Sequence, residues 1–549
     1  MLRTLRDAAR WSRRILPAVL FSASAALLMA GQPAQEPAEE ALAREILGAT
    51  GVEGGLIVHL GCGDGRLTAA LRAGDRYLVH GLDRDAAKVA AAREMIQRLG
   101  LYGPVSVDQL TGERLPYADN LAGLVVSEDL GGVTLDELMR VLAPGGVAYV
   151  NSGGQWTKNV KPWPAEMDQW THFFHDASGN AVAEDTLVDP PTSIRWVAKP
   201  LYCRSHEIDS SISALVSAGG RIFYILDEGL TGITDQRLPA RWSLVARDAF
   251  SGVLLWKRPI PRWGWREWKR EELEGKDWTQ LRGQRVQFPA ELPRRLVADG
   301  DRVYVTLGYA AGLSILDAAT GEIVRECEGT EGTHEIVYQS GVLVVRIANR
   351  LADELERRTG KTPPEEIAAI EADTGKTLWR KATAPLRPLT LAIGGDRVVF
   401  HTAKELVCSS LASGEERWRQ NSNPGHTLVV HDGVVLIIDP QALRAFSVES
   451  GETLWTGPGG QGPGAGTDLF VVGGLVWHGR PAAGPGFAEL EARYQQHAET
   501  GVRMVGYDLK TGEVRKTVEI DNLLSAGHHF RCYRSKATAR RREVPPNCQ

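Results

Sequence analysis

The sequence LIVHLGCGDGRLTAAL, residues 56–71, predicts a buried strand, a glycine-rich turn and the beginning of a helix. Gly61, Gly63 and Gly65 directly follow the apolar strand, and glycine is needed where a backbone turns sharply and approaches a ligand without a Cβ in the way. The helix that follows directs the positive end of its dipole toward the same turn. We therefore expect a nucleotide-like ligand at the end of a strand in an α/β sheet.

The residues after this turn continue the alternation of helix and strand that is typical of a parallel sheet. A second strand, YLVHGLD, ends in Asp83, at a distance from the glycines where a carboxylate can accept the hydroxyls of a ribose. LPYADNLAGLVVSED (115–129) and ELMRVLAPGGVAYV (137–150) follow in order. We predict one Rossmann-like α/β domain over residues 41–155.

Together these segments resemble the class I S-adenosylmethionine-dependent methyltransferases. The resemblance implies that the loop from Gly61 to Gly65, with Cys62 and Asp64 between its glycines, holds the methionine part of the cofactor. It further implies that Asp83 binds the ribose and that a residue near Asp108 flanks the adenine. S-adenosyl-L-methionine is therefore the expected cofactor.

The sequence departs from this family pattern at one position of the cofactor site. His59 stands where an acidic residue usually precedes the loop, and a neutral histidine can form hydrogen bonds but supplies no negative charge. No catalytic motif follows the fourth strand, so we assign no catalytic residue. Glu128 and Asp129 lie at the end of that strand, where ligands of α/β sheets collect, and either they are candidate bases or they solvate a loop.

The chain after residue 190 consists of short β-rich runs that alternate with turn signals. One phrase recurs after many of these runs, as in ARDAFSGVLLW (246–256), SLASGEERW (410–418) and FSVESGETLW (446–455). A period near 40 residues is typical of four-stranded blades, each of which must pack against its neighbours. Six copies have their glycines at Gly252, Gly321, Gly375, Gly414, Gly451 and Gly512.

This array resembles the quinoprotein-type β-propellers, whose repeats carry a tryptophan-docking phrase of the form AxDxxTGxxxW. We therefore predict an all-β propeller over residues 191–549, with seven to eight blades and the last one incomplete. Dehydrogenases of that family have an adjacent pair of cysteines, and the sequence has no Cys-Cys, so binding of pyrroloquinoline quinone is not expected. The propeller is expected to be a rigid scaffold that binds a protein or a polysaccharide.

The connector, residues 156–190, contains His172, His175 and Asp176 at spacings that metal ligands could use. Aromatic residues surround both histidines, so we favour buried or interfacial histidines and assign no metal site. The run resembles the linker of multidomain bacterial proteins that join a methyltransferase-like module to a quinoprotein-like propeller.

Two insertions interrupt the repeats. Residues 261–284 are rich in tryptophan and charge, and they either line a rim that binds a sugar or peptide or pack over the propeller. Residues 350–368 are expected to form a short helical insertion.

The first residues of the chain predict export. A basic stretch precedes the apolar run ILPAVLFSASAALLMA (15–30), which is short for a membrane-spanning helix. We predict a signal peptide at residues 1–30 and a linker at 31–40, with an uncleaved anchor as the alternative. SRRIL (12–16) partly matches a twin-arginine signal. The protein is expected in the periplasm or the cell envelope, and any contact with the membrane is expected through this segment alone.

The composition narrows the remaining functional classes. A formal net charge of −5 gives no basic surface for nucleic acid, and the six cysteines show no CxxC pair that would indicate a zinc site. The leading hypothesis is methyl transfer from S-adenosylmethionine to an unknown acceptor. The first alternative is a non-catalytic binding protein with a relic methyltransferase domain, and the second is a quinone-dependent oxidoreductase.

Overall fold

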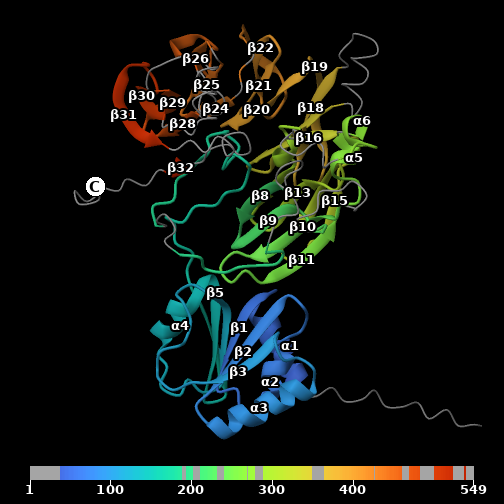
Figure 1. Cartoon of the computed structure of the whole chain (residues 1–549), viewed down its shortest axis with the longest axis vertical. Coiled ribbons are helices and arrows are strands. Elements are labelled where there is room, and N and C mark those ends of the chain that lie inside the picture. The colour runs from blue at the N-terminus through green and yellow to red at the C-terminus, as the bar shows by residue number, and fades with distance from the viewer. Residues whose placement is uncertain are drawn as a thin grey trace, which may run out of the picture.

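The computed structural model describes most of the chain from residue 38 onward (Figure 1). The signal peptide, the twin-arginine motif and most of the linker, which were predicted for residues 1–40, therefore lie outside the described residues. No helix among the described residues is long and apolar enough to cross a membrane. The described ranges are 38–187, 193–201, 211–230, 240–268, 270–277, 289–348, 364–423, 425, 427–439, 441–459, 469–481, 500–523 and 537–538.

The N-terminal domain is a six-stranded sheet in the order β3-β2-β1-β4-β5-β6. Its strands pair in parallel except β6, which runs antiparallel to β5 and extends the domain to Val160, beyond the expected boundary at 155. The elements are α1 (Ala38–Thr50), β1 (Gly55–Leu60), α2 (Arg66–Ala70), β2 (Tyr77–Asp83), α3 (Ala86–Arg98), β3 (Val105–Gln109), β4 (Ala122–Ser127), α4 (Leu135–Val141), β5 (Leu142–Ser152) and β6 (Gln155–Val160).

Two apolar cores lie on the two faces of this sheet. Every residue of β1 is buried, as expected for a continuous apolar strand in a parallel sheet. Ile57 packs with α1, α2 and α3 on one face, whereas Leu56 and Val58 pack with α4 on the other. Figure 1 shows this sandwich, with α4 on the side of the sheet opposite to α1–α3.

The rest of the described chain contains six four-stranded antiparallel sheets. Each sheet is built from four consecutive strands, and the first strand of each lies against the first strand of the next. The strands are β8 (Ile212–Ala218), β9 (Arg221–Asp227), β10 (Trp242–Asp248), β11 (Leu254–Pro259); β12 (Leu296–Asp299), β13 (Arg302–Thr306), β14 (Leu313–Asp317), β15 (Ile323–Glu326); β16 (Thr333–Gln339), β17 (Val342–Ile347), β18 (Glu365–Glu371), β19 (Thr377–Thr383); β20 (Leu386–Gly394), β21 (Arg397–Thr402), β22 (Glu405–Ser410), β23 (Glu416–Asn421); β24 (Thr427–His431), β25 (Val434–Ile438), β26 (Ala442–Ser447), β27 (Thr453–Pro458); and β28 (Leu469–Val472), β29 (Leu475–Pro481), β30 (Thr500–Asp508), β31 (Val514–Leu523). Three short helices, α5 (Trp265–Trp268), α6 (Arg270–Leu273) and the 3₁₀ helix η2 (Leu292–Arg295), lie between the first and second sheets.

The recurring phrase forms the turn between the third and fourth strands of each sheet. Its glycine has a positive φ, for example 74° at Gly451, which favours glycine. In four of the six sheets a tryptophan of the preceding sheet lies on that glycine: a Cβ at Gly451 would be 2.6 Å from Cδ2 of Trp418, whereas at Gly375 the neighbouring side chain is Arg325. The Trp418 indole also donates a 2.7 Å hydrogen bond from Nε1 to the carbonyl of Val448. Glycine is therefore required here both for the turn and for the approach of the ring.

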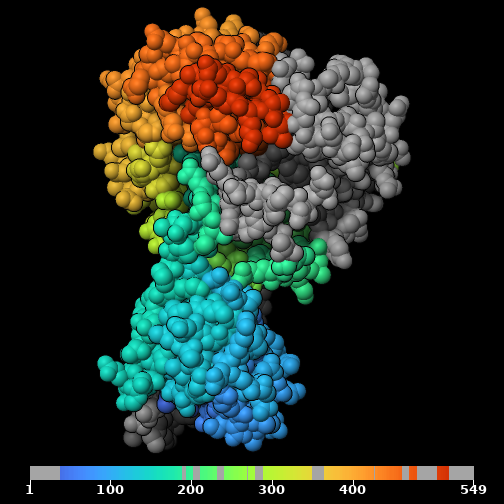
Figure 2. All heavy atoms as spheres, turned by 90° about the vertical axis from the view of Figure 1, so that its left-hand side faces the viewer, coloured from blue at the N-terminus to red at the C-terminus, as the bar shows by residue number. Residues whose placement is uncertain are grey.

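The connector reaches all six sheets through one short segment, residues 169–183, which we call the strap. It contains the two-residue strand β7 (Val182–Ala183), which pairs in parallel with β32 (Ala537–Thr538). Figure 2 shows the connector rising from the N-terminal domain into the β region. From its N-terminal to its C-terminal end, the strap accepts hydrogen bonds from the backbone N–H groups of Ser217 (2.7 Å), Ala298 (3.0 Å), Tyr338 (3.0 Å), Ile393 (2.8 Å), Val430 (2.9 Å) and Val471 (3.0 Å), which lie in β8, β12, β16, β20, β24 and β28.

One expectation about the insertions is wrong. Residues 350–368 were expected to be helical, but Glu365–Glu371 form strand β18, and residues 350–363 lie outside the described range. The strand forms because its apolar side chains are buried between β17 and β19, and this tertiary pairing overrides the local helix propensity of its glutamates and alanines.

Candidate functional site

The glycine loop lies at the carboxyl end of β1, where a ligand of an α/β sheet is expected. Gly61, Gly63 and Gly65 all have positive φ, at 71°, 56° and 81°. A Cβ at Gly65 would be 2.9 Å from Cβ of Ala92, so this glycine lets the loop pack against α3. A Cβ at Gly63 would meet nothing within 4 Å, so the middle of the loop borders open space.

Asp83 lies at the end of β2 and holds the loop directly. Its carboxylate is 7% exposed, and Oδ2 accepts a 3.0 Å hydrogen bond from the backbone N–H of Gly63. Oδ1 accepts a 2.9 Å hydrogen bond from the backbone N–H of Asp85. Because a carboxylate oxygen has two lone pairs, each of these oxygens can accept one more hydrogen bond, such as one from a ribose hydroxyl.

His59 is buried on the face of the sheet that carries α1–α3. Its side chain is 2% exposed, and Nδ1 is 2.8 Å from Oγ1 of Thr68 on α2, while Nε2 has no hydrogen-bond partner. Burial lowers the pKa of His59 to about 4, although the nearby carboxylate of Asp83 acts in the opposite direction. The imidazole is therefore neutral at pH 7 and joins the strand to α2, and it supplies no charge to the loop.

The two other side chains of the loop differ in exposure. Cys62 is buried, and burial raises the pKa of its thiol to about 12, so it packs as an apolar group. Asp64 is exposed, and its Oδ2 lies 3.3 Å from Nε of Arg66.

Asp108 lies on the edge strand β3 and is bonded within the domain. It forms an ion pair with Arg93 of α3, and its Oδ2 lies 3.2 Å from Nε2 of His80. The hydroxyl of Tyr117 lies 2.6 Å from Nδ1 of His80. Since Tyr117 can donate to Nδ1, His80 is neutral and donates from Nε2 to Asp108, and burial indeed lowers the pKa of His80.

The sequence analysis did not identify the three residues that bond to Asp108 directly or through one another, which are Arg93, His80 and Tyr117. His80 carried a signal, because it interrupts the apolar pattern of its strand. Arg93 and Tyr117 carried none, because their contacts join elements that are far apart in the sequence.

Glu128 and Asp129 are exposed at the end of β4. Asp129 lies beside the loop, because a Cβ at Gly61 would be 3.5 Å from its carbonyl oxygen. Its side chain caps the following turn, with Oδ1 2.9 Å from the backbone N–H of Gly131. The structure therefore brings together the loop, Asp83 and the acids after β4, whereas it turns Asp108 toward Arg93 and places His59 beneath the loop.

The candidate site opens away from the β region. The opposite, amino-terminal end of β1 contacts the first β sheet, since a Cβ at Gly54 would be 2.7 Å from Leu255 and one at Gly55 would be 3.5 Å from Asp248. Figure 1 shows the glycine-loop end of the N-terminal domain, near α2 and α3, on the side remote from the β region. The described part of the β region therefore does not cover the candidate cofactor site.

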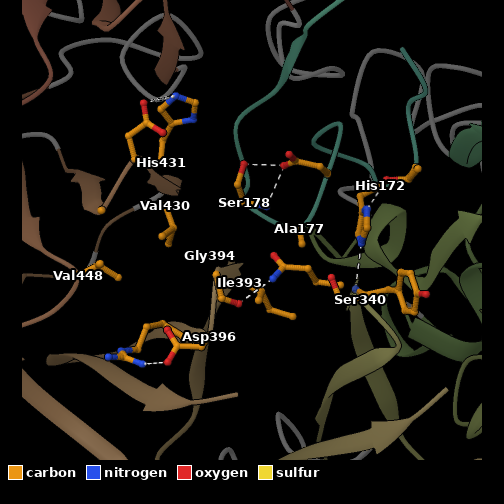
Figure 3. A pocket seen from close by; sticks show the side chains of 18 of the residues that line it. His172, Ala177, Ser178, Ser340, Ile393, Gly394, Asp396, Val430, His431 and Val448 are labelled. Atoms are coloured by element: carbon orange, nitrogen blue, oxygen red, sulfur yellow. Dashed lines mark hydrogen bonds and ion pairs between the residues drawn. The ribbon is translucent and has the colours of Figure 1, made fainter. Parts of the chain in front are cut away.

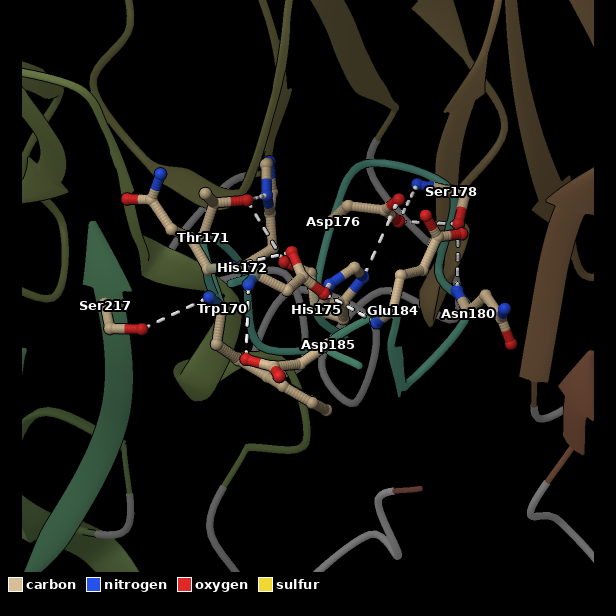
Figure 4. Close-up of polar contacts among 12 residues, drawn as sticks. Trp170, Thr171, His172, His175, Asp176, Ser178, Asn180, Glu184, Asp185 and Ser217 are labelled. Atoms are coloured by element: carbon tan, nitrogen blue, oxygen red, sulfur yellow. Dashed lines mark hydrogen bonds and ion pairs between the residues drawn. The ribbon is translucent and has the colours of Figure 1, made fainter. Parts of the chain in front are cut away.

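The two histidines of the connector are buried against the β sheets (Figure 4). Nε2 of His172 accepts a 3.0 Å hydrogen bond from the backbone N–H of Tyr338, so its proton is on Nδ1 and is donated to Oγ1 of Thr171 at 2.7 Å. Thr171 donates in turn to the carbonyl of His175 at 3.1 Å, and Nε2 of His175 lies 2.6 Å from Oδ2 of Asp168. Burial lowers the pKa of His172 to about 3.

These bonds use both ring nitrogens of His172 for internal contacts. Within the described ranges, no three His, Cys, Asp or Glu side chains are grouped so that they could hold a metal ion.

A cavity of about 740 Å³ lies between the strap and the hairpin turns of the third, fourth and fifth sheets (Figure 3). Arg397 in its wall is paired with Asp396 and, at 2.8 Å, with Glu449. The lining also contains the carboxylates of Asp176, Asp299 and Asp432 and the imidazoles of His172 and His431.

The tryptophan-rich insertion packs over the first two sheets where it is described. Trp263 and Trp265 are buried, and the ring of Trp263 lies 6.2 Å from that of Trp268 in an edge-to-face arrangement. These rings therefore pack as core residues rather than as an open rim, and residues 278–284 of the insertion lie outside the described residues.

The comparisons with known proteins agree with the division into two parts. A family profile described as a methyltransferase domain matches residues 57–146, and one described as outer membrane protein assembly factor BamB matches residues 364–526. No curated protein matches the chain.

Solved structures match the N-terminal domain. One is assigned as an S-adenosyl-L-methionine-dependent methyltransferase from Methanococcus maripaludis, with 24% identity, a TM-score of 0.20, and coverage of 21% of this chain and 57% of that chain. Another is a geranyl diphosphate C-methyltransferase from Streptomyces coelicolor, with 18% identity, a TM-score of 0.19, and coverage of 20% and 45%. The matched part thus spans about half the length of these structures. A [4+2]-cyclase also matches, with 24% identity, a TM-score of 0.19, and coverage of 20% of this chain and 43% of that chain.

Proposed function

We propose that the N-terminal domain binds S-adenosylmethionine and transfers its methyl group to an acceptor. The observation that carries this proposal is the contact between the Asp83 carboxylate and the backbone N–H of Gly63. This contact brings the expected ribose-binding acid to the glycine loop and leaves it able to accept further hydrogen bonds. The match of residues 57–146 to a methyltransferase domain supports the same assignment.

The residues that would hold the cofactor fit it unevenly. Asp83 would bind the ribose hydroxyls, and the open space at Gly63 leaves room for the methionine part. Asp108 is already bonded to Arg93 and His80, so a contact with adenine would require another residue near the end of β3 or the loss of these bonds. The bound cofactor supplies an electrophilic methyl group, and the chain would position an acceptor in line with it.

The acids after β4 are the candidate proton acceptors. Glu128 and Asp129 are exposed beside the loop, where either carboxylate could take the proton that an acceptor loses. Since the site opens away from the β region, we propose that the methyl acceptor is either a free molecule that enters from solvent or a group on a separate macromolecule.

The second candidate function is a non-catalytic binding protein with a relic methyltransferase domain. His59 favours it, because the neutral imidazole supplies no negative charge where the family has an acid. The internal bonds of Asp108 favour it as well. Quinone-dependent oxidation is not part of either proposal.

Calorimetric titration of the full chain with S-adenosylmethionine separates these two functions. We expect binding with an affinity of at least about −8 kcal/mol, which corresponds to micromolar or tighter dissociation. Asp83→Ala should weaken it at least tenfold, because charge-assisted hydrogen bonds of about 1.5–3 kcal/mol each are lost. Asp75→Ala, which removes an exposed carboxylate of the same domain, is the control. If millimolar S-adenosylmethionine produces no heat of binding, the first proposal is refuted and the non-catalytic binding protein with a relic methyltransferase domain is favoured.

We further propose that the β region is a propeller that binds a ligand. The succession of six sheets around one strap supports this arrangement, because each first strand contributes one N–H to the strap in chain order.

We place the ligand of the propeller, a protein or a polysaccharide, in the 740 Å³ cavity. Since Arg397 is neutralised by two acids, the remaining Asp176, Asp299 and Asp432 favour a positively charged protein segment. An oligolysine peptide should bind and an oligoglutamate peptide should not; equal binding of both would refute this charge preference.

We also propose that the protein is exported to the periplasm or the cell envelope, as residues 1–30 suggest. Fractionation of the native host with N-terminal sequencing tests this localisation. Recovery of the intact chain from the cytosol would refute it.

A further inference from the structure

A second cavity, of about 320 Å³, lies between the third and fourth sheets of the β region. The buried part of its lining is apolar and includes Ile367, Phe400 and Val407. The indole of Trp379, on the outermost strand of the third sheet, also lines it. This lining shares no residue with that of the 740 Å³ cavity, so the two are separate sites.

The cavity lies at a place that a large side chain fills in the other five described sheets. The place is on the third strand of a sheet, opposite the first residue of the fourth strand. The residues there are Arg247, Leu316, Ile370, Phe446 and Tyr507. Three of them pack in one core with the tryptophan that covers their sheet, as Phe446 does with Trp418.

The fourth sheet has Ser409 at this place, opposite Glu416. A serine is much smaller than the other five residues, so the space beside Trp379 is left open. The exposures agree, because the docking tryptophans of the first, fourth and fifth sheets are each 8% exposed, whereas Trp379 is only half-buried. Ser409 itself lines the cavity, is 2% exposed, and has no hydrogen-bond partner for its Oγ. The site therefore lacks both a packed side chain and a polar partner.

The sixth sheet shows which group completes such a place. The ring of Tyr507 lies 6.0 Å from that of Trp455, with 21° between the two planes, in a stacked arrangement that aromatic pairs favour. An aromatic ring beside Trp379 would complete the fourth sheet in the same way. Since an apolar cavity of about 150 Å³ binds benzene, the 320 Å³ here takes a ring together with the backbone that carries it.

The charged groups of the lining are paired with one another. Arg419 forms ion pairs with Glu405 at 2.7 Å and with Glu416 at 2.8 Å. Nζ of Lys381 donates a 2.8 Å hydrogen bond to the carbonyl of Gly414. Two carboxylates and two cations leave no net charge, so this cavity favours an uncharged group over an anion or a cation.

We propose that the 320 Å³ cavity binds the side chain of a tyrosine from a partner protein. The ring would stack beside Trp379 on the apolar lining, and the hydroxyl would bond to Ser409, whose Oγ can donate and accept. Tyrosine suits such an anchor because its ring is rigid and its hydroxyl finds a partner when buried. The site is additional to the one proposed for a positively charged segment, and it does not depend on how the sheets close into a ring.

Ligand-observed NMR of the full chain with uncharged tripeptides tests this site. The probes are blocked at both ends and carry tyrosine, phenylalanine or leucine between two glycines. At millimolar concentration the tyrosine peptide should bind, and the phenylalanine peptide should bind about threefold to tenfold more weakly because one hydrogen bond is lost. The leucine peptide, which has no ring, should bind more weakly still. Equal binding of the tyrosine peptide and either of the others would overturn the proposal.

Two substitutions of Ser409 separate the ring from the hydroxyl. Ser409→Ala keeps the cavity and removes the hydroxyl, so it should bind the tyrosine peptide no better than the phenylalanine peptide. Ser409→Phe fills the place as Phe446 does in the fifth sheet, and it should abolish binding of both. Ser213→Ala is the matched control, because Ser213 of the first sheet is also buried without a partner for its Oγ. This control should leave peptide binding unchanged.

Retained binding of the tyrosine peptide by Ser409→Phe would overturn the proposal. If that variant does not fold, Ser409→Leu gives the same test with the residue that the second sheet carries at Leu316. Binding of p-cresol without binding of the tyrosine peptide would show that the occupant is a free phenol, and the partner protein would be wrong. Oligolysine should bind all variants alike, so its failure to bind refutes the proposal for the 740 Å³ cavity and not this one.

Discussion

The buried His172 makes the stability of the β region depend on pH. Its Nε2 must be unprotonated to accept the backbone N–H of Tyr338, and burial lowers its folded pKa to about 3, against 6.5 for the ordinary residue. The unfolded chain therefore binds a proton at a higher pH than the folded chain does. The stabilisation is fully present above pH 6.5 and is lost as the pH falls from 6.5 toward 3, by about 1.4 kcal/mol per pH unit.

The variant His172→Gln isolates this effect. Glutamine does not titrate, and its Oε1 can accept the same hydrogen bond from Tyr338. Between pH 7 and pH 5, we expect the unmodified protein to lose about 2 kcal/mol more than the variant. The assay is urea unfolding of the β region, followed by tryptophan fluorescence, at half-unit steps of pH.

The range between pH 7 and pH 9 serves as an internal control, because His172 is neutral there in both states and the two curves should run parallel. Equal losses for both proteins below pH 6 would refute the reasoning. In that case His172 would be protonated in the folded protein, and its hydrogen bond with Tyr338 would not form as described.

Two further predictions compare matched substitutions. Gly65→Ala should lower the free energy of unfolding of the N-terminal domain by about 2–4 kcal/mol, since it adds a collision with Ala92 to the strain of a positive φ. Gly63→Ala introduces the strain alone and should lower it by about 1 kcal/mol. Equal losses for the two variants would contradict the packing argument. Trp418→Ala should destabilise the β region by about 3–5 kcal/mol, because the indole is 8% exposed. Trp379→Ala should cost less, about 2 kcal/mol, because this ring is only half-buried. A larger loss for Trp379 would show that burial does not set the cost.

Much of the candidate cofactor site could be predicted because its parts are local. The strand, the glycines and the helix that hold the loop are consecutive, so their spacing predicts the turn. Asp83 could be predicted for the same reason, since it ends the next strand. The pairing of Asp108 with Arg93 and the hydrogen bonds of His80 with Asp108 and Tyr117 could not be predicted, because they depend on which strand is at the edge of the sheet and on which side chains fold over it.

The sequence by itself determined the two kinds of structure in this chain. The glycine loop and the recurring Thr/Ser-Gly phrase are local patterns, and their backbone requirements hold wherever the segments are placed. Only the tertiary structure decided which way the candidate site opens and that the connector is a strap along six sheets. The reason is physical: these features are contacts between segments that are far apart in the chain, and a contact of this kind depends on the packing of whole sheets rather than on the conformational preference of any one residue.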